Sequence, residues 1–257
     1  MTAVLETQGL SVSFGGVRAL VDVDLTVPEG SLVGLIGPNG AGKTTFIDAI
    51  SGFVPSRGRI LLGGEDITDL RPHDRATMGL ARTWQSIELF DDLSVEENLE
   101  VAARRPSMWS TVREVVGRSS STTSTAVEAL AQVGLEGIAD AMPSELSQGQ
   151  RKLVGVARAL VSEPKLVCCD EPAAGLDTSE SEALGRRLRA AVGGSRSMLL
   201  VDHDMGLVLG VSDYVYVLEF GKLIAHGPPE QVRRDPAVIM AYLGGEAAAQ
   251  LRAQEGT

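Results

Sequence analysis

Residues 31–52 of the chain read SLVGLIGPNGAGKTTFIDAISG. Ser31–Ile36 is a short apolar run stopped by a Gly-Pro pair, which predicts a buried strand. Thr44–Ile50 predicts a helix that a glycine closes. The intervening Gly37–Thr44 matches G-x-x-x-x-G-K-[ST], and a strand before it and a helix after it are the context that this pattern requires. The stretch therefore predicts an α/β fold with a phosphate-binding loop.

The chemistry of this loop follows from its residue types. Glycines let backbone N–H groups turn inward around phosphate oxygens, and the helix N-terminus adds partial positive charge. Lys43 is expected to reach the β- and γ-phosphates, and the Thr44 hydroxyl to ligate Mg²⁺. A glycine-rich turn with a chance lysine is the alternative, which the agreement of motif and context disfavours. The predicted nucleotide-binding residues are Gly37, Pro38, Asn39, Gly40, Ala41, Gly42, Lys43, Thr44 and Thr45.

A second motif, KLVCCDEP at Lys165–Pro172, is an apolar strand that ends in two carboxylates. Asp170 is expected to hold Mg²⁺, directly or through water. Glu171 would polarise the attacking water as a general base. Acidic residues at strand ends are common, so this interpretation depends on the phosphate loop that precedes it.

The remaining periodicity predicts strands that alternate with helices, and hence a mainly parallel sheet. Predicted strands are Val4–Ser13, Val21–Val27, Arg59–Leu62, Leu166–Cys169, Met198–Val201 and Tyr214–Leu218. Predicted helices are Leu93–Ala103, Ala126–Val133 and Gln150–Val161. The low-complexity tract Ser119–Thr125 (SSSTTST) is expected to be a solvated loop.

Composition excludes several classes of protein. The 257 residues carry a net charge of −11, which does not favour a nucleic-acid-binding surface. Cys168 and Cys169 are adjacent in an apolar run, which predicts buried thiols rather than a zinc site. No signal peptide is evident, and no apolar run approaches the roughly 18 residues that cross a bilayer. A function at a membrane would therefore require a partner that spans it.

Leu146–Gln150 (LSQGQ) resembles the LSGGQ signature of ABC-type ATPases, with Gln148 in place of the first glycine. Ser147 and Gln150 also fit a capping box at the start of a helix, so a plain helix cap is the alternative. The resemblance implies that Ser147, Gly149 and Gln150 meet a γ-phosphate, which the helix dipole would favour.

Other elements of that family follow in order. Phe14 matches the aromatic residue that stacks on adenine, although an ordinary core role is as good an explanation. Gln85, in RTWQ, matches the glutamine that senses Mg²⁺ and the transporter interface. Ala174–Asp177 matches the loop that contacts the partner subunit. His203, in VDHD, matches the switch histidine that reaches the γ-phosphate.

The resemblance covers about Leu5–Gly244 and implies a P-loop NTPase core with a mainly parallel sheet. It also implies an N-terminal antiparallel β part and a helical subdomain at about residues 86–160, within an ATPase domain spanning 1–244. Residues 245–257 are interpreted as a tail. The region Val101–Pro143 is shorter than is usual in the family.

Several segments, among them SVSFGGVRAL, VDHDMGLV and DPAVIMAYLG, are similar to ATP-binding subunits of branched-chain amino-acid transporters. This implies ATP and Mg²⁺ as cofactors, a second ATP-binding subunit, two membrane-spanning permease subunits and, indirectly, a substrate-binding protein. It places the chain at the cytoplasmic face of the membrane, with branched-chain amino acids, urea or a short amide as cargo.

Three other functions are weighed against import. A soluble ABC ATPase of DNA repair or translation would carry two cassettes, a coiled coil or zinc modules, and the sequence has none of these signals. A kinase would not need the signature at Leu146 or the histidine at His203. Lipid export by a similar cassette remains open.

Overall fold

The computed structural model describes residues 2–83, 89–103 and 120–242, and two sheets organise them. The smaller sheet is antiparallel, in the order β2-β1-β4-β5, and comes from the first quarter of the chain. Its strands are β1 (Ala3–Phe14), β2 (Val17–Pro28), β4 (Arg57–Leu62) and β5 (Glu65–Asp66). The predicted N-terminal antiparallel part is therefore confirmed, with strands slightly longer than their alternation indicated.

The larger sheet has the order β10-β9-β3-β8-β7-β6, and its pairs are parallel except β9 with β10. Its strands are β3 (Leu32–Ile36), β6 (Leu80–Arg82), β7 (Leu166–Asp170), β8 (Ser197–Val201), β9 (Tyr214–Glu219) and β10 (Lys222–Gly227). All five residues of β3, β7 and β8 are buried, as expected of strands covered on both faces. The carboxyl ends of these strands meet at one edge of the sheet.

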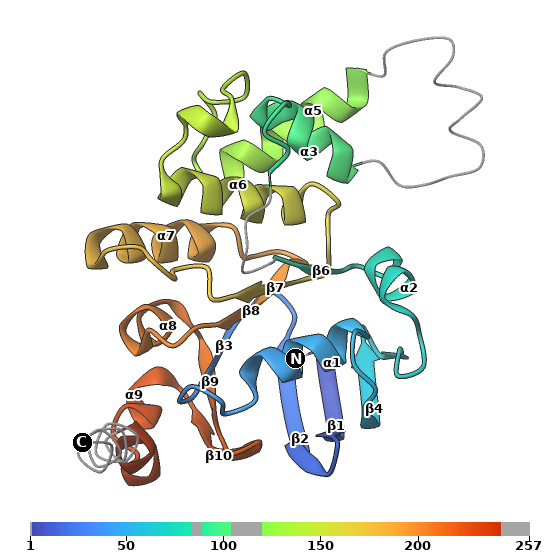
Figure 1. Cartoon of the computed structure of the whole chain (residues 1–257), viewed down its shortest axis with the longest axis vertical. Coiled ribbons are helices and arrows are strands. Elements are labelled where there is room, and N and C mark those ends of the chain that lie inside the picture. The colour runs from blue at the N-terminus through green and yellow to red at the C-terminus, as the bar shows by residue number, and fades with distance from the viewer. Residues whose placement is uncertain (1, 84–88, 104–119, 243–257) are drawn as a thin grey trace.

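Helices cover the larger sheet and form a separate layer beyond it. Figure 1 shows α3, α5 and α6 gathered at one end of the molecule and β1, β2 and β4 toward the other. The helices are α1 (Lys43–Ser51), α2 (Pro72–Thr77), α3 (Val95–Ala103), α5 (Ser120–Gln132), α6 (Gln148–Leu160), α7 (Thr178–Ala190), α8 (Met205–Val211) and α9 (Pro229–Val232). Packing is close: a Cβ built on Gly34 of β3 would lie 2.3 Å from Cγ1 of Val208 in α8.

The serine- and threonine-rich tract was expected to be a loop, and this is wrong for its helical part. Helix α5 begins at Ser120 and runs through the tract to Gln132. Relative to alanine, each serine or threonine makes helix formation less favourable by only about 0.5 kcal/mol. The apolar residues Ala126, Ala129 and Leu130 are buried against α3 and α6, and this packing outweighs the weak local preference.

The two adjacent cysteines confirm the predicted buried thiols. Cys168 and Cys169 are free and fully buried in β7. Burial raises the pKa of Cys169 to about 12, so its thiol stays protonated at neutral pH.

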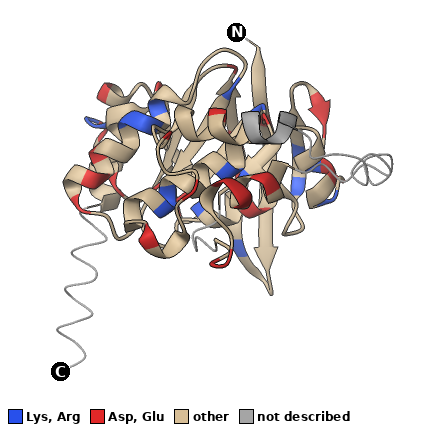
Figure 2. Cartoon of the chain, turned by 90° about the horizontal axis from the view of Figure 1, so that it is seen from above, with Lys and Arg blue, Asp and Glu red and all other residues tan. Residues whose placement is uncertain are grey.

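Acidic and basic residues are both distributed over the described part of the chain. In Figure 2 Lys and Arg residues are interspersed with Asp and Glu rather than gathered on one face of the view. Within the part of the chain that the structure describes, no helix is long and apolar enough to cross a membrane.

Candidate functional site

The glycine loop (Gly37–Thr45) joins the carboxyl end of β3 to α1. Gly40 and Gly42 have φ angles of +79° and +107°, a region that residues with a Cβ rarely adopt. A Cβ built on Gly42 would also lie 2.7 Å from the carbonyl oxygen of Ala19. Both the backbone conformation and the close approach of β2 therefore require glycine at this position.

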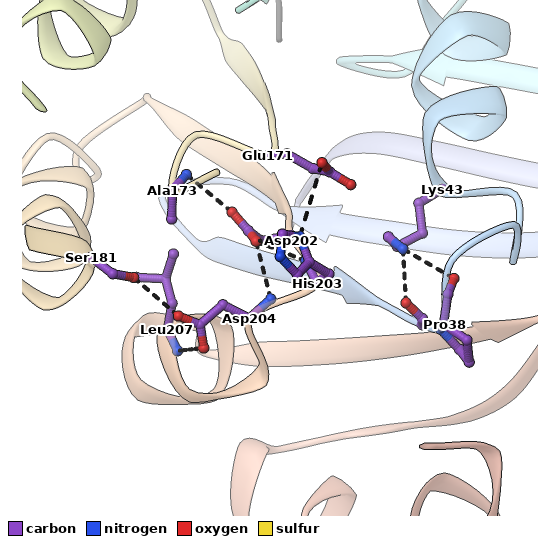
Figure 3. Close-up of polar contacts among 10 residues, drawn as sticks. Pro38, Lys43, Glu171, Ala173, Ser181, Asp202, His203, Asp204 and Leu207 are labelled. Carbon is purple, nitrogen blue, oxygen red and sulfur yellow. Dashed lines mark hydrogen bonds and ion pairs between the residues drawn. The ribbon is translucent and has the colours of Figure 1, made fainter. Parts of the chain in front are cut away.

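Lys43 is the first residue of α1 and is only 5% exposed. Its Nζ donates to the carbonyl oxygens of Gly37 at 2.8 Å and Pro38 at 3.2 Å, as Figure 3 shows. Burial lowers the pKa of Lys43, and the negative charge of Glu171 is the largest of the effects that oppose this. The ammonium group is thus held against the glycine loop and beside carboxylates.

A cavity of about 390 Å³ lies over the glycine loop. It is lined by Asn39–Thr45, by Val17–Ala19 of β2, by Glu171 and by the turn residues Phe220 and Gly221. Most of the residues predicted to bind phosphate are therefore brought together with the predicted general base. Gly37 and Pro38 are not among the lining residues, but their carbonyl oxygens accept hydrogen bonds from Lys43.

Asp170 ends β7 and is 2% exposed. Nη2 of Arg82 donates to its Oδ2 at 3.0 Å, while Nη1 of Arg82 donates to Asp48 in α1 at 2.5 Å. Burial raises the pKa of Asp170, and the Arg82 charge opposes this. Oδ1 of Asp170 is buried and finds no hydrogen-bond partner among the residues that the structure describes. An unpaired carboxylate oxygen of this kind fits the oxygen ligands that Mg²⁺ prefers.

Glu171 follows with a φ of +47°, which is unusual for a residue with a side chain. Its N–H donates to the carbonyl oxygen of Val201 at 2.7 Å, which fixes it above the end of β8. Nδ1 of His203 lies 3.9 Å from Oε2 of Glu171, and the histidine side chain is 54% exposed. The predicted base and the predicted switch histidine are therefore neighbours at the edge of the sheet (Figure 3).

Asp202 is a site residue that the sequence reasoning missed, although it stands in the VDHD segment. It is fully buried and accepts three backbone hydrogen bonds. Its Oδ1 accepts from the N–H groups of His203 at 2.8 Å and Asp204 at 3.1 Å, and its Oδ2 accepts from that of Ala173 at 3.2 Å. Through these hydrogen bonds, Asp202 connects the turn that contains His203 to the segment that follows Glu171. A carboxylate directly after a buried strand was the available signal.

Ser147 caps α6, as its capping box predicted. Its Oγ accepts from the N–H of Gln150 at 3.2 Å, and Oε1 of Gln150 accepts from the N–H of Ser147 at 2.9 Å. Gly149 follows in the first turn of the helix. These three residues do not line the cavity over the glycine loop. Within one chain the structure therefore does not bring the signature to the predicted phosphate site.

Four other predicted residues or segments lie outside the cavity lining or outside the described residues. Phe14 is 49% exposed at the end of β1 and is absent from the cavity lining. Gln85 lies outside the described residues, as does the tail 245–257. The loop Ala174–Asp177 packs against the signature: a Cβ built on Gly175 would lie 2.9 Å from Nε2 of Gln148.

The sequence of the chain matches two protein-family models. The family model described as ABC transporter matches residues 20–174, which include the glycine loop, LSQGQ and Glu171. The chain belongs to the ABC transporter family. It is accordingly an ATPase of that family and binds nucleotide. A model described as branched-chain amino acid ATP-binding cassette transporter matches residues 222–248.

Individual relatives of this ABC ATPase cover almost the whole chain. The high-affinity branched-chain amino acid transport ATP-binding protein BraF of Pseudomonas aeruginosa is 38% identical over 94% of this chain and 98% of its own length. The lipopolysaccharide export system ATP-binding protein LptB of Escherichia coli is 35% identical over 94% and 98%. The ADP conformation of MJ1267, an ATP-binding cassette of an ABC transporter, matches with a TM-score of 0.81 at 30% identity, over 95% of this chain and all of that one.

Proposed function

We propose that this chain is the ATP-hydrolysing subunit of an importer of branched-chain amino acids. It would act at the cytoplasmic face of the membrane, with a second ATP-binding subunit and two membrane-spanning permease subunits. The observation that carries the cargo assignment is the match of residues 222–248 to the branched-chain model. The similarity to BraF over nearly the full length of both chains supports the same assignment.

ATP binding is assigned to the glycine loop. Its backbone N–H groups and the start of α1 would surround the phosphates, and Lys43 would exchange its two carbonyl acceptors for phosphate oxygens. Thr44 and the unpaired Oδ1 of Asp170 would hold Mg²⁺. Mg²⁺ there would neutralise charge on the β- and γ-phosphates.

Hydrolysis is assigned to Glu171 and His203. Glu171 lines the cavity beside Lys43 and Thr44, so its carboxylate is placed to accept a proton from a water that attacks the γ-phosphate. His203 is half-exposed next to it and could donate to the γ-phosphate from the same side. Asp202 would fix the positions of Glu171 and His203 relative to each other through its three backbone hydrogen bonds.

The signature residues are assigned to a second subunit's ATP. Ser147 and Gly149 do not line the cavity of their own chain, and the start of α6 carries backbone N–H groups and the positive end of the helix dipole. In a dimer with each ATP shared between subunits, these groups would meet the γ-phosphate bound by the opposing glycine loop. The dimer would then depend on the γ-phosphate.

Gene deletion followed by uptake measurements tests the proposal. Uptake of labelled leucine is expected to fall and to return with the wild-type gene, but not with the Glu171→Gln gene expressed at the same level. Labelled aspartate serves as the control cargo. Unchanged leucine uptake in the deletion strain contradicts the cargo assignment, and loss of labelled urea uptake instead would assign the same role to a different cargo.

Lipid export is the second candidate, favoured by the 35% identity to LptB. It predicts a different phenotype in the same strain. Leucine uptake would remain normal while newly made lipid accumulated at the inner side of the membrane. Extraction of surface lipid from the deletion and the complemented strains separates the two functions.

A further inference from the structure

A second cavity, of about 230 Å³, lies between helix α6 and the ends of strands β6 and β7. Figure 1 shows α6 beside this edge of the larger sheet. Among the described residues that line the second cavity, Arg82, Lys152 and Arg158 are cationic and Glu171 alone is anionic. Glu171 also lines the cavity over the glycine loop, so the two cavities share the predicted general base as a wall.

Lys152 is a buried cation of α6, the helix that Ser147 caps. It is only 7% exposed, and within the described ranges of the chain its ammonium group makes no hydrogen bond and no ion pair. Burial lowers the pKa of Lys152, and the charges of Asp202 and Glu171 oppose this from beyond ion-pair distance. A buried charge is costly unless it is paired, so this ammonium group is suited to an anionic ligand in the second cavity.

The rest of the polar lining adds positive charge and hydroxyl groups. Arg82 is already committed to Asp170, so it contributes mainly its electrostatic field. Arg158 contributes a further positive charge, and Thr83 and Ser162 contribute hydroxyl groups that can donate hydrogen bonds. Ammonium, guanidinium and hydroxyl donors form strong hydrogen bonds with ionised oxygen atoms. The lining therefore favours an oxyanion.

The size of the second cavity and its one carboxylate narrow the choice of oxyanion. Cavities that hold organic ligands usually exceed about 300 Å³, and one water takes about 30 Å³, so 230 Å³ suits a small ion with a few waters. Hydrogen phosphate carries an O–H that the carboxylate of Glu171 can accept, whereas sulfate has no proton to donate. The lining thus favours phosphate over sulfate.

We propose that the second cavity is a binding site for inorganic phosphate, which the product of ATP hydrolysis occupies after it leaves the glycine loop. Lys152 would hold the ionised oxygens of the phosphate, and Glu171 would accept a hydrogen bond from its protonated oxygen. The role in product exit rests on the assignment of hydrolysis to Glu171. The binding site itself rests only on the lining of the second cavity.

Titration of the nucleotide-free full chain with inorganic phosphate, followed by phosphorus NMR, tests the binding site. It is carried out in Lys43→Ala protein, because this change weakens phosphate binding at the glycine loop. Adding Lys152→Met is expected to weaken phosphate binding by about 10- to 100-fold, through loss of a charge-assisted hydrogen bond. Lys152→Arg should retain binding, and Lys222→Met, at an exposed position of β10, is the matched control. Sulfate, followed by its competition with phosphate, should bind at least about tenfold more weakly than phosphate.

Steady-state hydrolysis with added phosphate tests the role in product exit. Phosphate in the second cavity is expected to lower kcat without raising the KM for ATP, whereas phosphate on the glycine loop would compete with ATP. In Lys152→Met, this effect on kcat should require about 10- to 100-fold more phosphate. Inhibition of the wild-type chain that is purely competitive with ATP would overturn the role in exit.

The binding site is overturned if Lys152→Met leaves the phosphate affinity of the Lys43→Ala protein unchanged, or if sulfate binds as tightly as phosphate. Hydrolysis at the wild-type rate by Glu171→Gln would instead refute the assignment of the general base, and with it the role in exit. The titration without nucleotide does not depend on that assignment, so the two failures are distinguishable.

Discussion

Arg82 commits one carboxylate oxygen of Asp170 to an ion pair and leaves the other without a partner in the described part of the chain. The guanidinium also reaches Asp48, in the helix that begins at Lys43. One buried cation therefore connects the end of β7 to the helix that follows the glycine loop. Asp170 can offer a single, oriented oxygen because its second oxygen is already bound.

Replacing Arg82 with methionine is expected to lower the free energy of unfolding by about 3 kcal/mol, because it leaves a buried carboxylate unpaired. Urea denaturation of the nucleotide-free protein measures this. Arg59→Met is the control, since Arg59 forms an exposed pair with Asp66 at 3.1 Å and its loss should cost less than about 0.5 kcal/mol. Equal effects of the two changes would argue against a special role for the buried pair.

Lys43→Ala is expected to leave a folded protein that binds ATP more than about tenfold more weakly, because charge-assisted hydrogen bonds contribute about 1.5–3 kcal/mol each. Equilibrium dialysis with labelled ATP gives the affinity, and circular dichroism checks the fold. Lys222→Ala, at an exposed position of β10, provides the matched loss of a lysine. Tight ATP binding by a well-folded Lys43→Ala protein would refute the assignment of the phosphate site.

Glu171→Gln is expected to bind ATP, to hydrolyse it about 10²–10⁴-fold more slowly, and to accumulate as a dimer. The amide keeps the shape of the side chain but cannot accept the proton of the attacking water. Size-exclusion chromatography with ATP, and with ADP as control, shows the dimer, and phosphate release gives the rate. A variant that stays monomeric with ATP bound, at high protein concentration, would contradict a site shared between subunits.

Asp202→Asn is expected to lower the free energy of unfolding by about 1–3 kcal/mol, because its new NH₂ group would face the N–H of Ala173. Hydrolysis should slow as well, since both the Glu171 and His203 segments lose a fixed position. Asp204→Asn is the milder control, because the Ser181 hydroxyl at 3.1 Å can accept from the new amide. If both variants unfold at the same urea concentration, Asp202 has no organising role.

The sequence predicted those parts of the site that follow from local chemistry. The glycine loop and the capping box at Ser147 are each fixed by residues a few positions apart, so a motif suffices to find them. The ion pair between Arg82 and Asp170 joins residues 88 positions apart, and β6 is too short for periodicity to reveal it. The helix through Ser120 was missed for the opposite reason, because its local composition disfavours what tertiary packing stabilises.

The place of β3 in its sheet bears on how the protein is made. β3 ends at Ile36, but its two neighbours are β8 and β9, which finish at Val201 and Glu219. During synthesis the glycine loop leaves the ribosome before β8 and β9, the neighbours of β3, have been made, and contacts so distant in sequence form slowly. An arrested nascent chain shorter than about residue 219 would carry the intact motif and still be unable to retain ATP. We therefore expect nucleotide capture to be a late event in the biogenesis of this protein, after the strands of the larger sheet have been translated.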